Sequence, residues 1–142
     1  MILASISPRR KEILENFGFI FKTFTKNIEE TSSKTTIEEI IKDIAEKKAR
    51  AVAEDFPSEN VVGADTVVVV DNKILGKPHS REEAFNMLKS LSGREHEVIT
   101  AFSFVNMEKN IFYSDCENTK VFFKALSDEE INFIENNVKE ME

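Results

Sequence analysis

Short apolar runs alternate with amphipathic segments along the chain. Residues 1–4 form an uncharged apolar run that predicts a buried strand, and residues 60–70 form a nearly continuous β-branched run that predicts a central strand buried on both faces. Further strands are predicted at residues 19–25, 73–75, 96–105 and 111–123. The last two are separated by a polar turn, so they should pair as an antiparallel hairpin.

Four segments repeat apolar residues at helical spacing. Their predicted N-caps are Ser7, Thr35 or Thr36, Ser80 and Ser127. The longest segment carries a buried stripe of Ile37, Ile40, Ile41, Ile44, Ala45, Ala49, Val52 and Ala53. These helices and strands account for most of the chain.

Composition limits the kinds of partner. A chain of 142 residues with 41% hydrophobic content can bury the core of one domain, expected to span residues 1–142. The net charge of −7 disfavours general nucleic-acid binding, except at local basic pockets. The lone cysteine, Cys116, excludes an intramolecular disulfide. The sequence shows no secretory leader and no run of membrane-spanning length, so a cytoplasmic protein without membrane contact is expected.

The first predicted helix contradicts a local rule. Arg9, Arg10 and Lys11 occupy its first turn, although the helix dipole favours acidic residues there. A strand, a serine-rich turn, a helix N-terminus and two arginines together favour phosphate binding. A solvated basic turn is the alternative that spacing leaves open.

Asp65 is a carboxylate in the most apolar segment of the chain. Isolated charges are costly to bury, so a metal, a cation or a ligand is its expected partner. The alternative is an aspartate at a strand break, capped by backbone amides. Gly63, two residues earlier, indicates a bulge or the close approach of another backbone. Taken alone, Glu30 and Lys48 are more typical of solvated charge.

Six short motifs then resemble, in order, those of the Maf family of nucleoside triphosphate pyrophosphatases. They are Leu3–Arg10, Ile28–Thr31, Lys48–Arg50, Gly63–Thr66, Gly76–Pro78 and Leu91–Gly93. The resemblance implies an α/β fold, with an elongated mixed sheet flanked by helices around a nucleotide-binding cleft and related to inosine triphosphatases. It also implies hydrolysis of a nucleoside triphosphate to the monophosphate and pyrophosphate with a divalent metal, Mg or Mn.

The resemblance assigns roles by position. Asp65 matches the family's proton acceptor and, with Glu30, the metal-holding carboxylates. The positions around the phosphates are Ser5, Arg9, Arg10, Lys48, Thr66 and Lys77. Arg9 and Thr66 match the subgroup that acts on dTTP and UTP.

The sequence departs from the family at two places. Lys47 stands where the family usually has glutamate, and we expect it to adjust a surface pair. The family also continues after the last helix with an Asp-Lys-Ala-Gly segment and a glutamine-bearing motif, so we expect a C-terminally truncated domain that associates with itself, either as a homodimer or by aggregation. A catalytically impaired nucleotide-binding or regulatory protein, associated with septum formation, is the alternative to an active enzyme.

Overall fold

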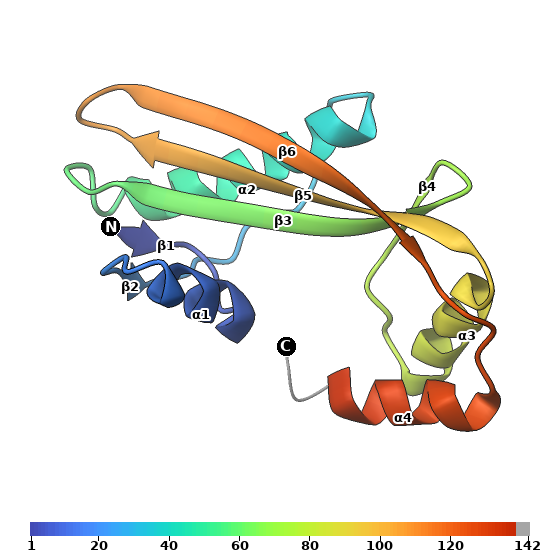
Figure 1. Cartoon of the computed structure of the whole chain (residues 1–142). Helices are drawn as coiled ribbons and strands as arrows, with labels where there is room; N and C mark the ends of the chain where they lie inside the picture. The colour runs from blue at the N-terminus through green and yellow to red at the C-terminus, as the bar shows by residue number, and fades with distance from the viewer. Residues whose placement is uncertain (139–142) are drawn as a thin grey trace. The chain divides into compact units, whose positions relative to one another are not determined.

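The computed structural model describes residues 1–138 of the chain (Figure 1). In chain order its elements are β1 (Ile2–Leu3), α1 (Pro8–Asn16), β2 (Lys22–Thr23), α2 (Ile37–Ala53), β3 (Val61–Val70), β4 (Lys73–Leu75), α3 (Arg81–Leu91), β5 (Glu95–Asn106), β6 (Ile111–Phe122) and α4 (Asp128–Val138).

The strands of this region form one mixed sheet. Its order is β2-β1-β3-β5-β6, and β4 pairs with β3. β1 is parallel to both β2 and β3, whereas β3 and β4 are antiparallel. β5 and β6 are neighbours joined by a four-residue turn, which confirms the predicted hairpin. The run predicted as a central strand is β3, which lies between β1 and β5.

The chain folds into two compact units. Unit 1 contains Met1–Thr66 and Thr100–Glu117, and unit 2 contains Val67–Ile99 and Asn118–Glu142. β3, β5 and β6 continue from one unit into the other. The single domain expected from the sequence stays a prediction. Every predicted site residue except Lys77 belongs to unit 1.

The core of unit 1 lies between α2 and the sheet, where Figure 1 draws α2 behind β3. Small side chains of α2, including Ala49 and Ala53, belong to one buried cluster with Ile2, Val61 and Val105 of three different strands. Gly63 explains how closely the helix approaches. A Cβ atom at Gly63 would lie 2.5 Å from the carbonyl oxygen of Ala45 and 2.8 Å from the amide nitrogen of Ala49. The predicted close approach of another backbone is therefore confirmed.

Unit 2 contains the other two helices. α3 and α4 lie side by side in Figure 1. The chain leading into α4 is held by the hydroxyl of Ser92, which accepts a hydrogen bond from the amide of Leu126 at 2.6 Å. No helix within residues 1–138 is long and apolar enough to cross a membrane.

The N-terminal half shows where local patterns succeed and fail. Ser7 and Thr36 cap α1 and α2 as predicted, and each side chain accepts a backbone N–H bond. The strand predicted at 19–25 shrinks to Lys22–Thr23. Phe19, the first residue of the predicted strand, is bonded to the end of α1 instead, because its amide donates to the carbonyl of Leu14 at 3.2 Å. The extended pairing therefore starts later than the alternation of residues predicts.

Gly63→Ala tests the close approach of α2 to β3. The added methyl group would clash with helix backbone rather than with a flexible side chain, so we expect a loss of stability of about 2 kcal/mol or more. Urea unfolding measures it. Gly76→Ala is the matched control, because a Cβ atom there meets nothing within 4 Å. Equal stability of the two variants would contradict the packing described.

Candidate active site

Six of the predicted site residues meet near the carboxyl end of β1, and they are Ser5, Arg10, Glu30, Lys48, Asp65 and Thr66. β1 pairs with β3 through Leu3 and Val62, and the amide of Ala4 adds a bond to the carbonyl of Val62 at 2.8 Å. The chain then turns through residues 5–7 into α1. Asp65 and Thr66 of β3 thus lie beyond the last residue of β1 in this register.

The first of two polar clusters is built around Arg10. Its guanidinium donates from Nη1 to Ser5 Oγ at 3.1 Å and from Nη2 to Thr66 Oγ1 at 3.0 Å. Ser7 caps the helix by accepting from the amide of Arg10 at 3.4 Å. Burial lowers the pKa of Arg10 from its usual range, and the Asp65 carboxylate opposes this shift. The basic turn is therefore not simply solvated, because one of its arginines is fixed against the sheet.

The second cluster is built around Lys48 of α2. Its ammonium lies 3.0 Å from Glu30 Oε1 and 3.2 Å from Asp65 Oδ1, and it also donates to the carbonyl of Ala64 at 3.4 Å. The side chains of Lys48 and Asp65 are mostly buried, with 19% and 12% exposed. Asp65 thus has the cationic partner predicted for a carboxylate in an apolar strand. Glu30 and Lys48 are paired charges rather than isolated solvated ones.

The two clusters are coupled through β3. Asp65 and Thr66 are consecutive, and successive side chains of a strand project to opposite faces. Asp65 binds Lys48 from α2, whereas Thr66 binds Arg10 from α1. The electrostatic effect of Asp65 on the pKa of Arg10 joins the clusters. The site therefore gathers an ammonium, a guanidinium, two carboxylates and hydroxyl groups.

Two side chains of α2 hold the loop that carries Glu30. Lys47 Nζ donates to the carbonyl of Thr31 at 2.7 Å, and Asp43 Oδ2 accepts from Ser32 Oγ at 2.6 Å. Lys47 and Asp43 also form an ion pair at 3.4 Å. Lys47 makes a surface pair as expected, and in addition it anchors the loop. The sequence does not predict that Asp43 and Ser32 take part in this anchor, because neither residue belongs to a recognisable motif.

The remaining residues are less closely integrated. Arg9 is exposed on the first turn of α1. Lys77 belongs to unit 2, on the segment between β4 and α3, and its role stays a prediction. Thr100 of β5 was missed. Its hydroxyl lies 3.1 Å from that of Thr66, but a threonine inside an alternating strand gives no sequence signal.

A divalent metal fits the Glu30–Asp65 pair only in a limited sense. No group of three or more His, Cys, Asp and Glu side chains gathers within the described part of the chain. Mg²⁺, however, is often held by one or two carboxylates together with substrate phosphates and water. Two carboxylates around one ammonium leave a net charge of −1, which suits an added cation. The pair therefore fits a metal that arrives with a triphosphate.

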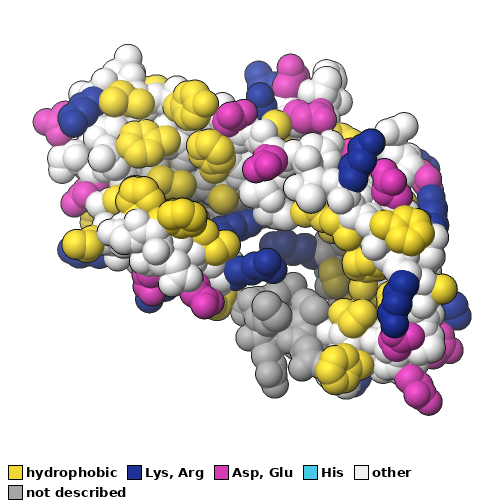
Figure 2. All heavy atoms as spheres, in the orientation of Figure 1, with side chains coloured by type: hydrophobic (Ala, Val, Ile, Leu, Met, Phe, Trp, Pro, Cys, Tyr) yellow, Lys and Arg dark blue, Asp and Glu magenta, His cyan; other side chains and the backbone are white. Residues whose placement is uncertain are grey.

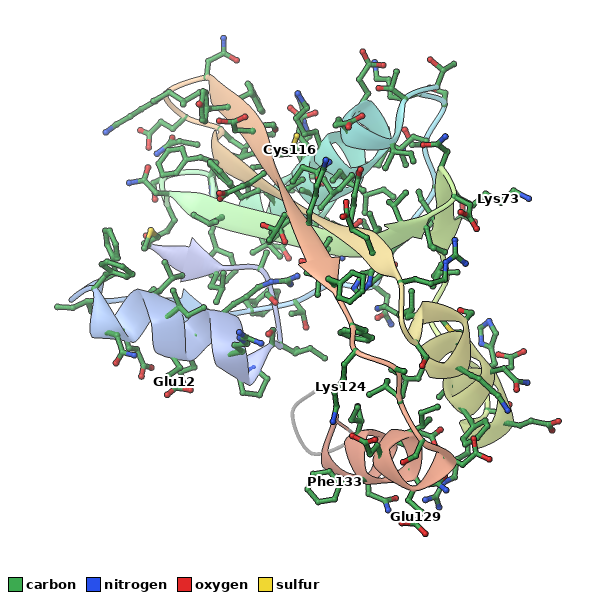
Figure 3. The ribbon with its side chains drawn as sticks, turned by 45° about the vertical axis from the view of Figure 1, so that its right-hand side comes forward. Glu12, Lys73, Cys116, Lys124, Glu129 and Phe133 are labelled. Atoms are coloured by element: carbon green, nitrogen blue, oxygen red, sulfur yellow. The ribbon has the colours of Figure 1, made fainter. Side chains whose placement is uncertain are left out.

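A groove of about 320 Å³ beside α4 is a poorer candidate. It is lined by Lys124, Leu126, Glu129, Glu130, Phe133 and Ile134, three of which are labelled in Figure 3. All of them belong to unit 2, and none is a predicted site residue. Its mostly apolar walls carry two carboxylates against the single ammonium of Lys124, which is paired with Glu130, so they offer no free cation to a triphosphate.

Comparison with known proteins places the chain in a family. A family model described as "Maf-like protein" matches residues 1–141. The chain belongs to the Maf family. It is 55% identical over 133 residues to a dTTP/UTP pyrophosphatase of Fusobacterium nucleatum, covering 94% of this chain and 69% of that protein. It is 46% identical over 137 residues to a protein of the same name from a Thermoanaerobacter species, covering 95% of this chain and 72% of the relative.

Solved structures confirm the expected Maf fold. The Ham1 protein of Staphylococcus aureus matches with a TM-score of 0.60 at 14% identity, covering 99% of this chain and 98% of that one. A nucleoside-triphosphatase, or dITP/XTP pyrophosphatase, of Mycobacterium abscessus matches with a TM-score of 0.54 at 18% identity, covering 84% of this chain and 71% of that one. At these identities the likeness concerns the fold alone.

The loop anchor makes a prediction about pH. The hydrogen bond from Ser32, with help from Lys47, lowers the pKa of Asp43. Ionised Asp43 therefore stabilises the folded chain above the ordinary aspartate pKa of about 4, and this contribution is lost as pH falls through the lower folded pKa. We expect Asp43→Asn to be less stable than the parent at pH 7, and we expect this difference in unfolding free energy, measured with urea, to shrink as pH falls below about 4.

Glu46→Gln is the control for this prediction. Glu46 pairs with Arg50 on the same helix at 3.5 Å with the same four-residue spacing, but that pair lies on exposed side chains. Its removal should change stability little at any pH. A stability difference between Asp43→Asn and the parent that does not vary with pH would contradict the electrostatic account.

Proposed function

We propose that this chain is a nucleoside triphosphate pyrophosphatase that hydrolyses dTTP and UTP to the monophosphate and pyrophosphate. One observation carries the proposal. Asp65 and Thr66 are consecutive residues of β3, and Asp65 contacts Lys48 while Thr66 contacts Arg10. Maf membership and the names of the relatives support the reaction and the two substrates.

The Arg10 cluster is proposed to hold the phosphates. Arg10 can bind phosphate oxygens through guanidinium N–H groups that Ser5 and Thr66 do not use. The N-terminus of α1 adds the positive end of a helix dipole, and exposed Arg9 adds a second cation. We assign Lys77 to the phosphates as well, on the family resemblance alone.

The Lys48 cluster is proposed to serve the attacking water. Asp65 accepts a proton from the water while the water oxygen attacks phosphorus. The phosphoanhydride bond between the α- and β-phosphates breaks, and pyrophosphate leaves. Lys48 fixes the orientation of the Asp65 carboxylate through the contact at 3.2 Å. Most of the rate gain in such reactions comes from positioning and from neutralising charge on the phosphate oxygens.

Mg²⁺ or Mn²⁺ held by Glu30 and Asp65 would supply part of that neutralisation. Hydrolysis should therefore stop when EDTA is added and return with either metal.

We place the reaction in the cytoplasm, without nucleic-acid or membrane partners, in keeping with the net charge of −7.

We further propose that the chain forms homodimers through the edge of its sheet. β6 ends the strand order, and most of its residues are exposed. Near the hairpin turn, Phe102, Ile111 and Tyr113 expose about 40–55% of their area, and Figure 2 shows apolar side chains gathered over this part of the surface. An exposed edge strand with apolar side chains promotes pairing with a second chain.

Asp65→Asn tests the chemistry. Removing a general base typically costs about 10²–10⁴-fold in rate, so pyrophosphate release from dTTP and UTP should fall by that amount while the fold persists. Asp71→Asn is the control. Asp71 lies in a turn with φ of 53°, which asparagine tolerates, and pairs with Arg94 outside the site. A folded Asp65→Asn chain with near-parental turnover would remove Asp65 from the mechanism.

Tyr113→Lys tests the proposed dimer. A lysine on an edge strand opposes pairing with another chain, so the dimer should dissociate at concentrations at which the parent stays associated. Sedimentation velocity on both proteins measures the difference. Glu97→Lys, a charge change on the neighbouring strand β5, is the control. A parent chain that sediments as a monomer at every concentration would contradict the proposal.

A further inference from the structure

We propose that Thr100 is a positioning residue, which holds Thr66 and through it orients the Arg10 guanidinium toward the phosphates. This inference rests on the proposed function. It concerns a side chain that neither the family motifs nor the predicted site includes. It follows from one continuous chain of contacts from β5 through β3 to α1.

The donor and the acceptor are fixed for the contact between Arg10 and Thr66. Arg10 can only donate, so Thr66 Oγ1 must accept from Nη2 across 3.0 Å. Thr66 Oγ1 also lies 3.1 Å from Thr100 Oγ1, and either hydroxyl can donate across that distance. With one partner on each side, the Thr66 hydroxyl is held in the position that receives Arg10. Without Thr100, one of these two restraints would disappear.

Thr100 is suited to this task because its own backbone is rigidly placed. It lies in β5, the strand next to β3, and its neighbours in sequence, Ile99 and Ala101, are almost completely buried. A hydroxyl on a strand residue with buried neighbours on both sides is a fixed reference point, whereas Arg10 is a long side chain on a helix that buries none of its residues.

The contacts of Arg10 explain why a single hydroxyl can matter. The guanidinium is fixed at two points, Ser5 on the turn after β1 and Thr66 on β3. Both partners are neutral, so they fix the direction of the guanidinium without cancelling its charge. A Thr66 hydroxyl that is free to turn away would leave Arg10 held firmly only at Ser5, and phosphate binding would then carry the entropy cost of ordering the guanidinium.

Thr100→Val tests this role, because valine matches threonine in shape and lacks the hydroxyl. We expect the Kd for inorganic tripolyphosphate, measured by calorimetry, and the KM for dTTP to rise about tenfold. Thr100→Ser should restore both to within about twofold to threefold, since it returns the hydroxyl. Thr100→Ala serves as a second hydroxyl-free variant if valine alters the thermal melt.

Ser103→Ala is the matched control. Ser103 is fully buried in the same strand, and its hydroxyl accepts from Ser114 of β6 at 2.8 Å. Removing that hydroxyl should lower the melting temperature and leave the Kd for tripolyphosphate unchanged. A purely structural Thr100 would behave in the same way as Ser103.

A double-mutant cycle decides whether Thr100 acts through Arg10. In an Arg10→Met background, Thr100→Val should have little further effect on tripolyphosphate binding, because its target is gone. Fully additive effects, or a Thr100→Val chain that binds like the parent, would overturn the positioning role alone. A parent chain that neither binds tripolyphosphate nor hydrolyses dTTP would overturn the proposed function and this inference together.

Discussion

The site depends on how closely α2 approaches β3. Gly63 has no side chain, so the helix backbone at Ala45 and Ala49 can approach the strand to a distance that a methyl group would prevent. Lys48 lies in the same helical turn as these alanines, and Asp65 lies two residues beyond Gly63. The small-residue contact therefore brings a lysine within 3.2 Å of a carboxylate on a buried strand. A larger side chain at position 63 would move the helix and separate the pair.

The two sides of the site are held in different ways. On the α2 side, the ammonium is fixed by a helix packed into the core, and a loop is anchored to that helix through Lys47 and Asp43. On the α1 side, the helix buries none of its residues, so packing cannot fix Arg10. Hydroxyl groups of Ser5 and Thr66 take over that role. Polar contacts therefore replace packing where the functional side chain must stay accessible.

Much of this arrangement could be predicted from the sequence, because its signals are local. The N-caps at Ser7 and Thr36 and the apolar stripe of α2 each involve residues close in the chain, and the structure has both. Gly63 marks the close approach of a helix, as a glycine inside a strand predicts, although β3 continues through it without a break. Asp65 was singled out because an apolar strand makes a carboxylate costly. The contacts of Thr100 and Asp43 could not be predicted in this way, since each joins residues more than ten positions apart through ordinary polar side chains. The strand predicted at 19–25 fails for a different, local reason, because a backbone bond from Phe19 to the end of α1 overrides the alternation of side chains.

The distribution of charge within the site then separates the proposed tasks of its cations. Lys48 is matched by two carboxylates, so its charge is already offset within the site, and its contact with the phosphates stays a prediction. Arg10 is held by neutral oxygens, and its charge remains available to an anion even though burial lowers its pKa. Hydrogen bonds between ionised partners are roughly twice as strong as neutral ones, so Arg10 gains more from a phosphate than from the two hydroxyls that hold it. In an acidic chain with a net charge of −7, this division provides a local positive region without a broad basic surface. Phosphate oxygens should thus settle on Arg10, and the neighbouring Asp65 carboxylate, which activates the water, keeps Lys48 as the cation that orients it.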